Sequence, residues 1–181
     1  MTLFKDLYKY RELLKTNIKK VYFPRDILPI SVVTSEGVNF LISTIIIIGF
    51  AIFGGIGLSI NILWYFVVLA IQYIVSIGFA YIVSSLSVYF RDLLHLLSII
   101  IQLLFYATPI VYATSSVPEN LQWIVKLNPM SYLIDAYRNI FYNKMPPSIN
   151  GLLICFGMGI SLCLIGYFTF RKLEKRFAEE L

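Results

Sequence analysis

The chain has 181 residues, a net charge of +5, and 59% hydrophobic against 14% charged residues, with a mean hydropathy of +0.79. Ordinary soluble domains hold fewer hydrophobic and more charged residues, so the composition excludes a soluble domain and predicts an all-α integral membrane protein. A disulfide is excluded as well, because Cys155 and Cys163 fall on one predicted helix, about 12 Å apart.

The first thirty residues predict a cytosolic segment in two parts. Residues 2–20 place apolar side chains on one helical face with lysines around it, which predicts an amphipathic helix at the cytosolic membrane surface, or alternatively a partner contact. Pro24 and Pro29 then make a stiff, charged elbow at 19–30. The simpler interpretation of the elbow is topogenic charge beside a span. No continuous apolar core of a cleavable signal peptide is present in this segment, so we expect the chain to begin in the cytosol.

Four uncharged runs are long enough to cross the hydrocarbon of a membrane, which takes about 20 residues. We therefore expect a transmembrane domain at 31–181 with four transmembrane helices at about 31–55, 60–87, 93–110 and 149–170. Small residues recur every fourth position, which predicts faces of close helix packing; the two rows are Ala51, Gly55 and Ser59, and Ser76, Ala80 and Ser84.

The stretch before the last span predicts two short amphipathic helices at the outer membrane surface, at about 117–127 and 129–142. Asn128 followed by Pro129 is a helix-start signal, because asparagine caps helices and proline suits the first helical position. In the second helix one stripe is apolar, formed by Met130, Leu133, Ile134, Tyr137 and Phe141. Asp135, Arg138 and Asn139 lie off that stripe.

A charged island at 88–95 separates two long uncharged runs and predicts a turn in the cytosol. Arg91, Asp92 and His95 have the spacing of a local polar cluster that could receive a partner or brace a gate. An ordinary helix start with favourable charge explains the same residues equally well. Further along, Gln102, Tyr106 and Thr108 are polar groups that we expect to face a neighbouring helix or a wet cavity.

Charge predicts the topology. Twelve of the fifteen basic residues fall in the segments assigned to the cytosol, at 1–30, 88–92 and 171–181. Lys126, Arg138 and Lys144 remain on the outer side. This matches the positive-inside tendency, so both termini are expected in the cytosol.

Several motifs in order carry a family resemblance. They are Lys-Lys-Val-Tyr-Phe-Pro-Arg-Asp-Ile-Leu-Pro at 19–29, Val-Tyr-Phe-Arg-Asp-Leu-Leu-His at 88–95, Gln102, Phe-Tyr-Ala-Thr-Pro-Ile-Val-Tyr at 105–112, Asn-Pro-Met-Ser-Tyr-Leu-Ile-Asp-Ala-Tyr-Arg at 128–138 and Gly-Tyr-Phe-Thr-Phe-Arg-Lys-Leu-Glu-Lys-Arg-Phe at 166–177. Together they resemble the permease subunits of type 2 ABC exporters, in the branch that exports O-antigen, teichoic acid, capsule and similar lipid-linked polysaccharides.

The resemblance implies a homodimer in the bacterial cytoplasmic (inner) membrane, surrounded by membrane lipids, with a separate ABC ATPase subunit and no nucleic acid. ATP and magnesium would belong to that ATPase, and this chain would carry no cofactor. The resemblance also implies two sets of site residues. ATPase coupling would fall to Lys20, Tyr22, Phe23, Pro24, Arg25, Asp26, Arg91, Asp92 and His95. The translocation path or outer gate would include Gln102, Tyr106, Thr108, Pro109, Tyr112, Asn128, Pro129, Tyr137 and Arg138.

One departure from the family pattern leaves alternatives open. Its members usually have six spans, and the first two are missing between the amphipathic start and the elbow. The alternatives are a shortened, transport-incompetent or partner-binding subunit, or an energy-independent four-helix membrane protein. The sequence shows no phosphate-binding loop, Cys/His metal array or serine elbow, so we expect no catalytic or metal-binding residues and no enzyme activity.

Overall fold

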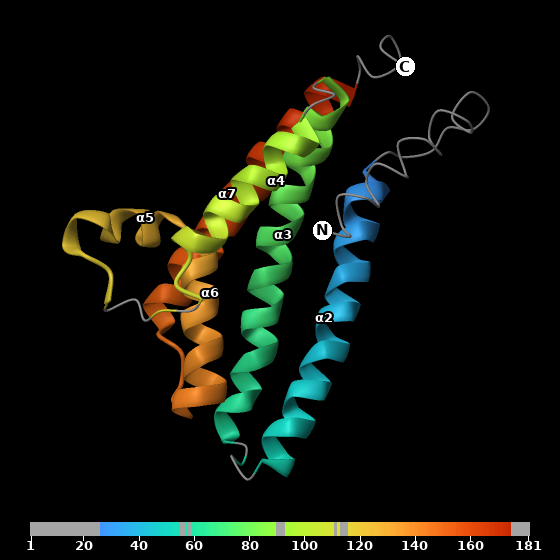
Figure 1. Ribbon diagram of the computed structural model, residues 1–181. Coiled ribbons are helices and arrows are strands. Elements are labelled where there is room, and N and C mark those ends of the chain that lie inside the picture. Colours follow the sequence, from blue (N-terminus) through green and yellow to red (C-terminus); the bar gives the residue numbers. More distant parts are fainter. Residues whose placement is uncertain are drawn as a thin grey trace.

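The computed structural model describes residues 26–54, 57, 59–89, 93–110, 112 and 116–174, and every regular element among them is a helix (Figure 1). The α-helices are α2 (Ile27–Phe53), α3 (Trp64–Tyr89), α4 (Leu93–Ala107), α5 (Gln122–Leu127), α6 (Pro129–Arg138) and α7 (Ile149–Glu174). Short 3₁₀ helices lead into α3 (Ile60–Leu63) and α5 (Glu119–Leu121), and a π-helical turn (Asn139–Asn143) extends α6. The amphipathic helix expected at 2–20 lies outside the described residues.

Three of the four expected spans are long and apolar enough to cross a membrane. They are Ile27–Phe53, Ile60–Ser87 and Ile149–Leu173. The expected span at 93–110 is instead the 15-residue helix α4. At 1.5 Å per residue it rises about 22 Å, which is less than the roughly 30 Å of hydrocarbon. Four full crossings are therefore not confirmed.

The core of the molecule is the contact between α3 and α7, which run side by side in the same direction (Figure 1). Their backbones approach most closely where α3 has Gly78, since a Cβ there would lie 2.8 Å from the backbone nitrogen of Cys163. Gly166 has the same role on α7, with the Gly78 carbonyl oxygen 2.8 Å from where its Cβ would be. This contact face differs from the row of small residues at 76, 80 and 84.

Helix α6 packs with its apolar face against one half of the α3–α7 pair. Leu133, Ala136 and Ile140 are 3% exposed or less and belong to one hydrophobic cluster with Val75 and Cys155. The Cys155 thiol donates to the carbonyl oxygen of Pro129, at the start of α6. Helix α6 therefore begins beside the middle of α3 and runs toward the end of the bundle where α2 stops and α3 starts, which we call the Phe53 end.

After α3, the chain runs back along the bundle through α4 and then through α6. Helix α3 ends near Asp26 and Arg171, at what we call the Asp26 end, and α7 begins nearer the Phe53 end (Figure 1). Helix α4 covers the first part of the return and α6 the last part. The return path is thus made of two helices, with the non-helical stretch and α5 between them at about half the height of α3.

Two hydrogen bonds between side-chain hydroxyl groups join helix α2 to α3. Thr34 Oγ1 lies 2.7 Å from Tyr73 Oη, and the Tyr65 hydroxyl donates to Thr44 Oγ1 at 2.9 Å. Much of the remaining surface of α2 is exposed and apolar, including Ile45 and Phe50. This contact is looser than the glycine-mediated packing of α3 on α7.

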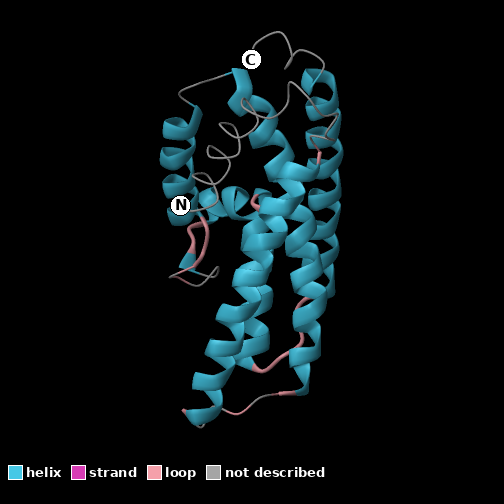
Figure 2. Cartoon of the chain, turned by 90° about the vertical axis from the view of Figure 1, so that its right-hand side faces the viewer, coloured by secondary structure: helices cyan, strands magenta, loops and turns pink. Residues whose placement is uncertain are grey.

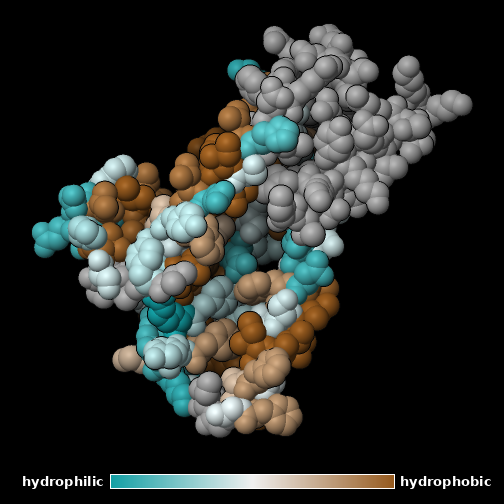
Figure 3. All heavy atoms as spheres, viewed as in Figure 1, coloured by the Kyte–Doolittle hydropathy of each residue, from teal (hydrophilic) through white to brown (hydrophobic). Residues whose placement is uncertain are grey.

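Helix α4 stands apart from the bundle. It overlaps α7 in Figure 1, but the view turned by 90° shows it at one side (Figure 2). Large apolar side chains such as Ile99 and Leu103 are exposed along it, and hydrophobic surface gathers over α4 and α2 (Figure 3). Exposed apolar surface of this extent is typical of lipid or protein surroundings, not of water.

We expect replacement of Gly78 by alanine to lower stability, because the added methyl group would push against the α7 backbone. Overpacking of this kind costs about 1–3 kcal/mol, which would lower the midpoint of thermal unfolding in detergent. Gly157→Ala on α7 is the matched control, since nothing lies within 4 Å of its Cβ position. Equal midpoints for the two variants would contradict close packing at Gly78.

Candidate functional site at the α4–α6 junction

The end of α4 is fastened to the start of α6 by polar side chains. Helix α4 stops at Ala107, and Thr108 and Pro109 follow, both buried. Asn128 caps α6, since its Oδ1 accepts from the backbone N–H of Met130 at 3.0 Å. The same side chain donates through Nδ2 to Thr108 Oγ1 at 2.8 Å. The predicted helix start at Asn128 and Pro129 is thereby confirmed, and one side chain serves both the cap and the junction.

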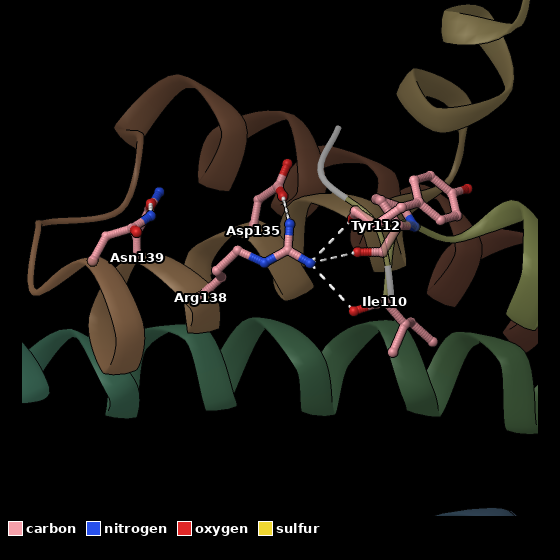
Figure 4. Close-up of polar contacts among 7 residues, drawn as sticks. Ile110, Tyr112, Asp135, Arg138 and Asn139 are labelled. Carbon is pink, nitrogen blue, oxygen red and sulfur yellow. Dashed lines mark hydrogen bonds and ion pairs between the residues drawn. The ribbon is translucent and has the colours of Figure 1, made fainter. Parts of the chain in front are cut away.

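Arg138 holds the segment that follows α4. Its Nη2 donates to the carbonyl oxygens of Pro109, Ile110 and Tyr112 at 2.9, 3.3 and 3.2 Å (Figure 4). Its Nη1 lies 3.6 Å from a carboxylate oxygen of Asp135, one turn earlier on α6. The guanidinium group therefore joins three backbone oxygens of one segment to a carboxylate of another.

This arrangement follows from the break in the helix between α4 and α6. Where a chain leaves its helix inside a bilayer, the freed carbonyl groups have no water to bond, and each needs a partner within the protein. Arginine suits that task, because its planar group offers five N–H donors and stays charged. The ion pair with Asp135 offsets part of the positive charge that the position brings into an apolar region.

Tyr137 lies on a different side of α6 and contacts α2 and α3. Its hydroxyl group is 2.6 Å from Gln72 Oε1, in the middle of α3. Its ring packs against Phe40 of α2, Tyr65 of α3 and Phe141, with centroids 5.8, 5.9 and 6.5 Å away. An aromatic cluster with polar edges therefore occupies the place where α2, α3 and α6 meet.

The other residues implied for the path or gate are spread along α4. Gln102 is exposed, and the Tyr106 side chain is 67% exposed. The Tyr112 hydroxyl donates to the carbonyl oxygen of Tyr106 at 3.0 Å. The structure thus brings Thr108, Pro109, Tyr112, Asn128, Pro129 and Arg138 together and leaves Gln102 and the Tyr106 ring outside that group.

Most of the residues implied for coupling lie outside the described ranges, namely Lys20, Tyr22, Phe23, Pro24, Arg25, Arg91 and Asp92. His95 is exposed in the first turn of α4. Asp26 precedes α2, and its Oδ2 lies 3.2 Å from Nη2 of Arg171 on α7. Their role in coupling stays a prediction.

Sequence reasoning missed Asp135, Gln72 and Arg171 as contact residues. Gln72 had a usable signal, because it is a polar residue within an apolar span. Asp135 was assigned to the polar side of α6, and Arg171 to the basic stop of the last span. Within the described ranges no group of three or more His, Cys, Asp or Glu side chains is placed to hold a metal ion.

Comparison with known protein families covers the residues of the junction as well. Residues 15–142 match the ABC-2 type transporter family, a stretch that contains α2 to α6 and the whole junction. The chain belongs to this family. The ABC-2 type chain is also 39% identical over 165 residues to an O-antigen export system permease protein RfbA of Klebsiella pneumoniae, and 30% identical over 166 residues to a protein of that name from Myxococcus xanthus.

These alignments cover 91% of the chain but only 63% and 64% of the two relatives. A second Klebsiella pneumoniae RfbA protein is 38% identical over the same shares of both chains. The chain thus spans under two thirds of the length of the relatives that it matches.

Arg138→Gln should weaken the junction, because three carbonyl contacts and the ion pair with Asp135 are lost together. Leaving such groups without a charged donor costs about 2–3 kcal/mol, measured as a lower thermal midpoint in detergent. Lys126→Gln is the control, since it removes a basic side chain from exposed α5. If both variants unfold at the same temperature, Arg138 does not hold the junction.

Tyr137→Phe should lower the free energy of unfolding by about 1 kcal/mol, the net worth of a typical buried hydrogen bond, while the ring contacts remain. The hydroxyl group that the substitution removes is the donor of the hydrogen bond to Gln72. Tyr142→Phe provides the comparison, because that side chain is 82% exposed. Chemical unfolding in detergent gives both values, and a Tyr137 effect no larger than that of Tyr142 would argue against the Gln72 contact.

Proposed function

We propose that the chain is the membrane-spanning permease part of an ATP-driven exporter of lipid-linked polysaccharide of the O-antigen type. The observation that carries the proposal is the similarity of 91% of the chain to proteins named as O-antigen export permeases. Those names favour O-antigen over the teichoic acid and capsule polymers that the motifs also suggest.

The interrupted return path supports a transport role. Non-helical backbone at membrane depth occurs where it is buried in protein or lines a water-filled cavity. Here Arg138 and Asn128 fasten that backbone to α6, so α6 and the end of α4 can move as one unit against α3. We assign this unit to the outer gate of the path. The aromatic cluster around Tyr137 is suited to stacking on sugar rings as chains pass.

The Asp26 end of the bundle is the cytosolic end in this proposal, with both termini there and the protein in the bacterial cytoplasmic membrane. The elbow at 19–30 and the island at 88–95 lie toward that end of the chain's spans. Both then contact a separate ABC ATPase subunit, which binds ATP and magnesium. Two copies of the chain form the path as a homodimer.

Purification of the tagged protein from its own cells in mild detergent tests the proposal. We expect an ABC ATPase subunit to copurify in equal amount. Arg25→Ala and Arg91→Ala should each reduce that amount by about tenfold, the effect of losing one strong interface contact, and should reduce polysaccharide at the cell surface with it.

Lys126→Ala is the control, because Lys126 lies on α5, which extends from the side of the bundle away from the proposed docking face. A preparation without ATPase, from cells that express one, would overturn the proposal and favour an energy-independent protein. An ATPase that copurifies without any export would favour a partner-binding subunit.

A further inference from the structure

The start of α2 and the end of α7 are joined by a charged contact. Asp26 Oδ2 lies 3.2 Å from Arg171 Nη2, and the Asp26 side chain is 21% exposed. Asp26 occupies the N-cap position of α2, where an aspartate ordinarily accepts a hydrogen bond from its own helix. Here it makes no such bond. Its carboxylate is directed to another helix instead.

The Arg171 side chain is oriented by its own helix. Its Nε donates to the Tyr167 hydroxyl at 3.1 Å, and its guanidinium carbon lies 5.4 Å from the centre of the Tyr167 ring. A guanidinium group over an aromatic face is held by attraction to the ring. The tyrosine thus positions Arg171 toward Asp26.

A small apolar cluster lies against this contact and contains residues from all three long helices. Tyr81 of α3 and Phe170 of α7 are 7% and 2% exposed, with ring centroids 5.6 Å apart. Ile30 of α2, Ile77 and Leu173 pack against them. The Asp26–Arg171 ion pair therefore lies beside a packed apolar cluster to which α2, α3 and α7 all contribute.

Helix electrostatics favour both charges where they are. A negative group is stabilised at a helix N-terminus and a positive group at a C-terminus, and Asp26 precedes α2 while Arg171 is in the last turn of α7. One acceptor atom of the pair is unused, since Asp26 Oδ1 is buried and has no hydrogen-bond partner among the described residues. A carboxylate held by one oxygen can shift relative to its partner without leaving it.

We propose that the Asp26–Arg171 pair transmits displacement of the start of α2 to α7, and through α7 to the outer gate. This rests on the proposed function. Helix α7 carries Arg171 near one end and, nearer the other, Cys155, which donates to Pro129 at the start of α6. A continuous helix of 26 residues, about 39 Å long, links the two points rigidly. Asp26 and Arg171 are positioning residues in this role.

Two other side-chain hydrogen bonds of α2 lead to α3. Thr34 and Thr44 bond to Tyr73 and Tyr65, both on α3. Those are contacts between neutral hydroxyl groups partway along the span. The charged pair joins the part of α2 next to the elbow to α7, and it explains why an arginine ends the apolar run of the last span.

A double-mutant cycle tests the pair in the complex of the full chain with its ATPase, using Asp26→Asn, Arg171→Gln and both together. Three quantities are measured: copurified ATPase, ATP hydrolysis, and polysaccharide at the surface of the host. Arg171→Gln should keep the ATPase bound and hydrolysing while export falls by about fivefold or more, within the usual range of coupling effects, and Asp26→Asn should lower export by at least as much. The double variant should be no worse than either single one, because the two groups act as a unit.

Lys172→Gln is the matched control, since it removes the next basic residue, which is exposed in the same turn, and it should export normally. Tyr167→Phe removes only the hydroxyl group that orients Arg171 and should give a smaller loss of export with hydrolysis retained.

Additive losses in the double variant, unchanged export in the single variants, or hydrolysis that falls in step with export and protein level would overturn the proposal. Absence of the ATPase from the unchanged protein would instead overturn the proposed function, and the inference with it.

Discussion

Backbone carbonyl groups that leave a helix need new hydrogen-bond donors within the protein where water is excluded, and this constraint governs the stretch between α4 and α6. Helix α4 ends at Ala107, which frees carbonyl groups at about half the height of α3. Arg138 supplies donors to three of them, and Asn128 fixes the Thr108 side chain. The polar side chains of Asn128 and Arg138 therefore supply the hydrogen-bond partners that the end of α4 requires.

Helix α7 connects the features to which function is assigned. It packs against α3 through Gly78 and Gly166, supports the start of α6 through Cys155, and contacts α2 through Arg171. Close backbone approach makes the α3–α7 pair stiff, because no flexible side chain lies between the two helices at that level. The looser elements, α2 and α4, are attached to this pair at a few polar points.

The sequence predicted the apolar helices and the helix start at Asn128, because length, hydropathy and capping are local properties. It did not predict which face of α3 meets α7, since small residues recur on more than one face and Gly78, which makes a close approach, lies off the predicted row. It placed Asp135 and Arg138 off the apolar stripe of α6 and did not predict which atoms they contact. Their partners are backbone atoms and side chains distant in sequence, so the composition of the candidate site was largely predictable and its contacts were not.

The parallel arrangement of α3 and α7 sets the order in which the protein can be completed. During synthesis α2 and α3 are made first, α4, α5 and α6 follow, and α7 comes after them. The glycine face of α3 and part of the buried face of α6 pack against α7 and therefore have no partner there until α7 is made. Packing of α7 is thus a late step of assembly, and its failure leaves apolar surface open to cellular quality control.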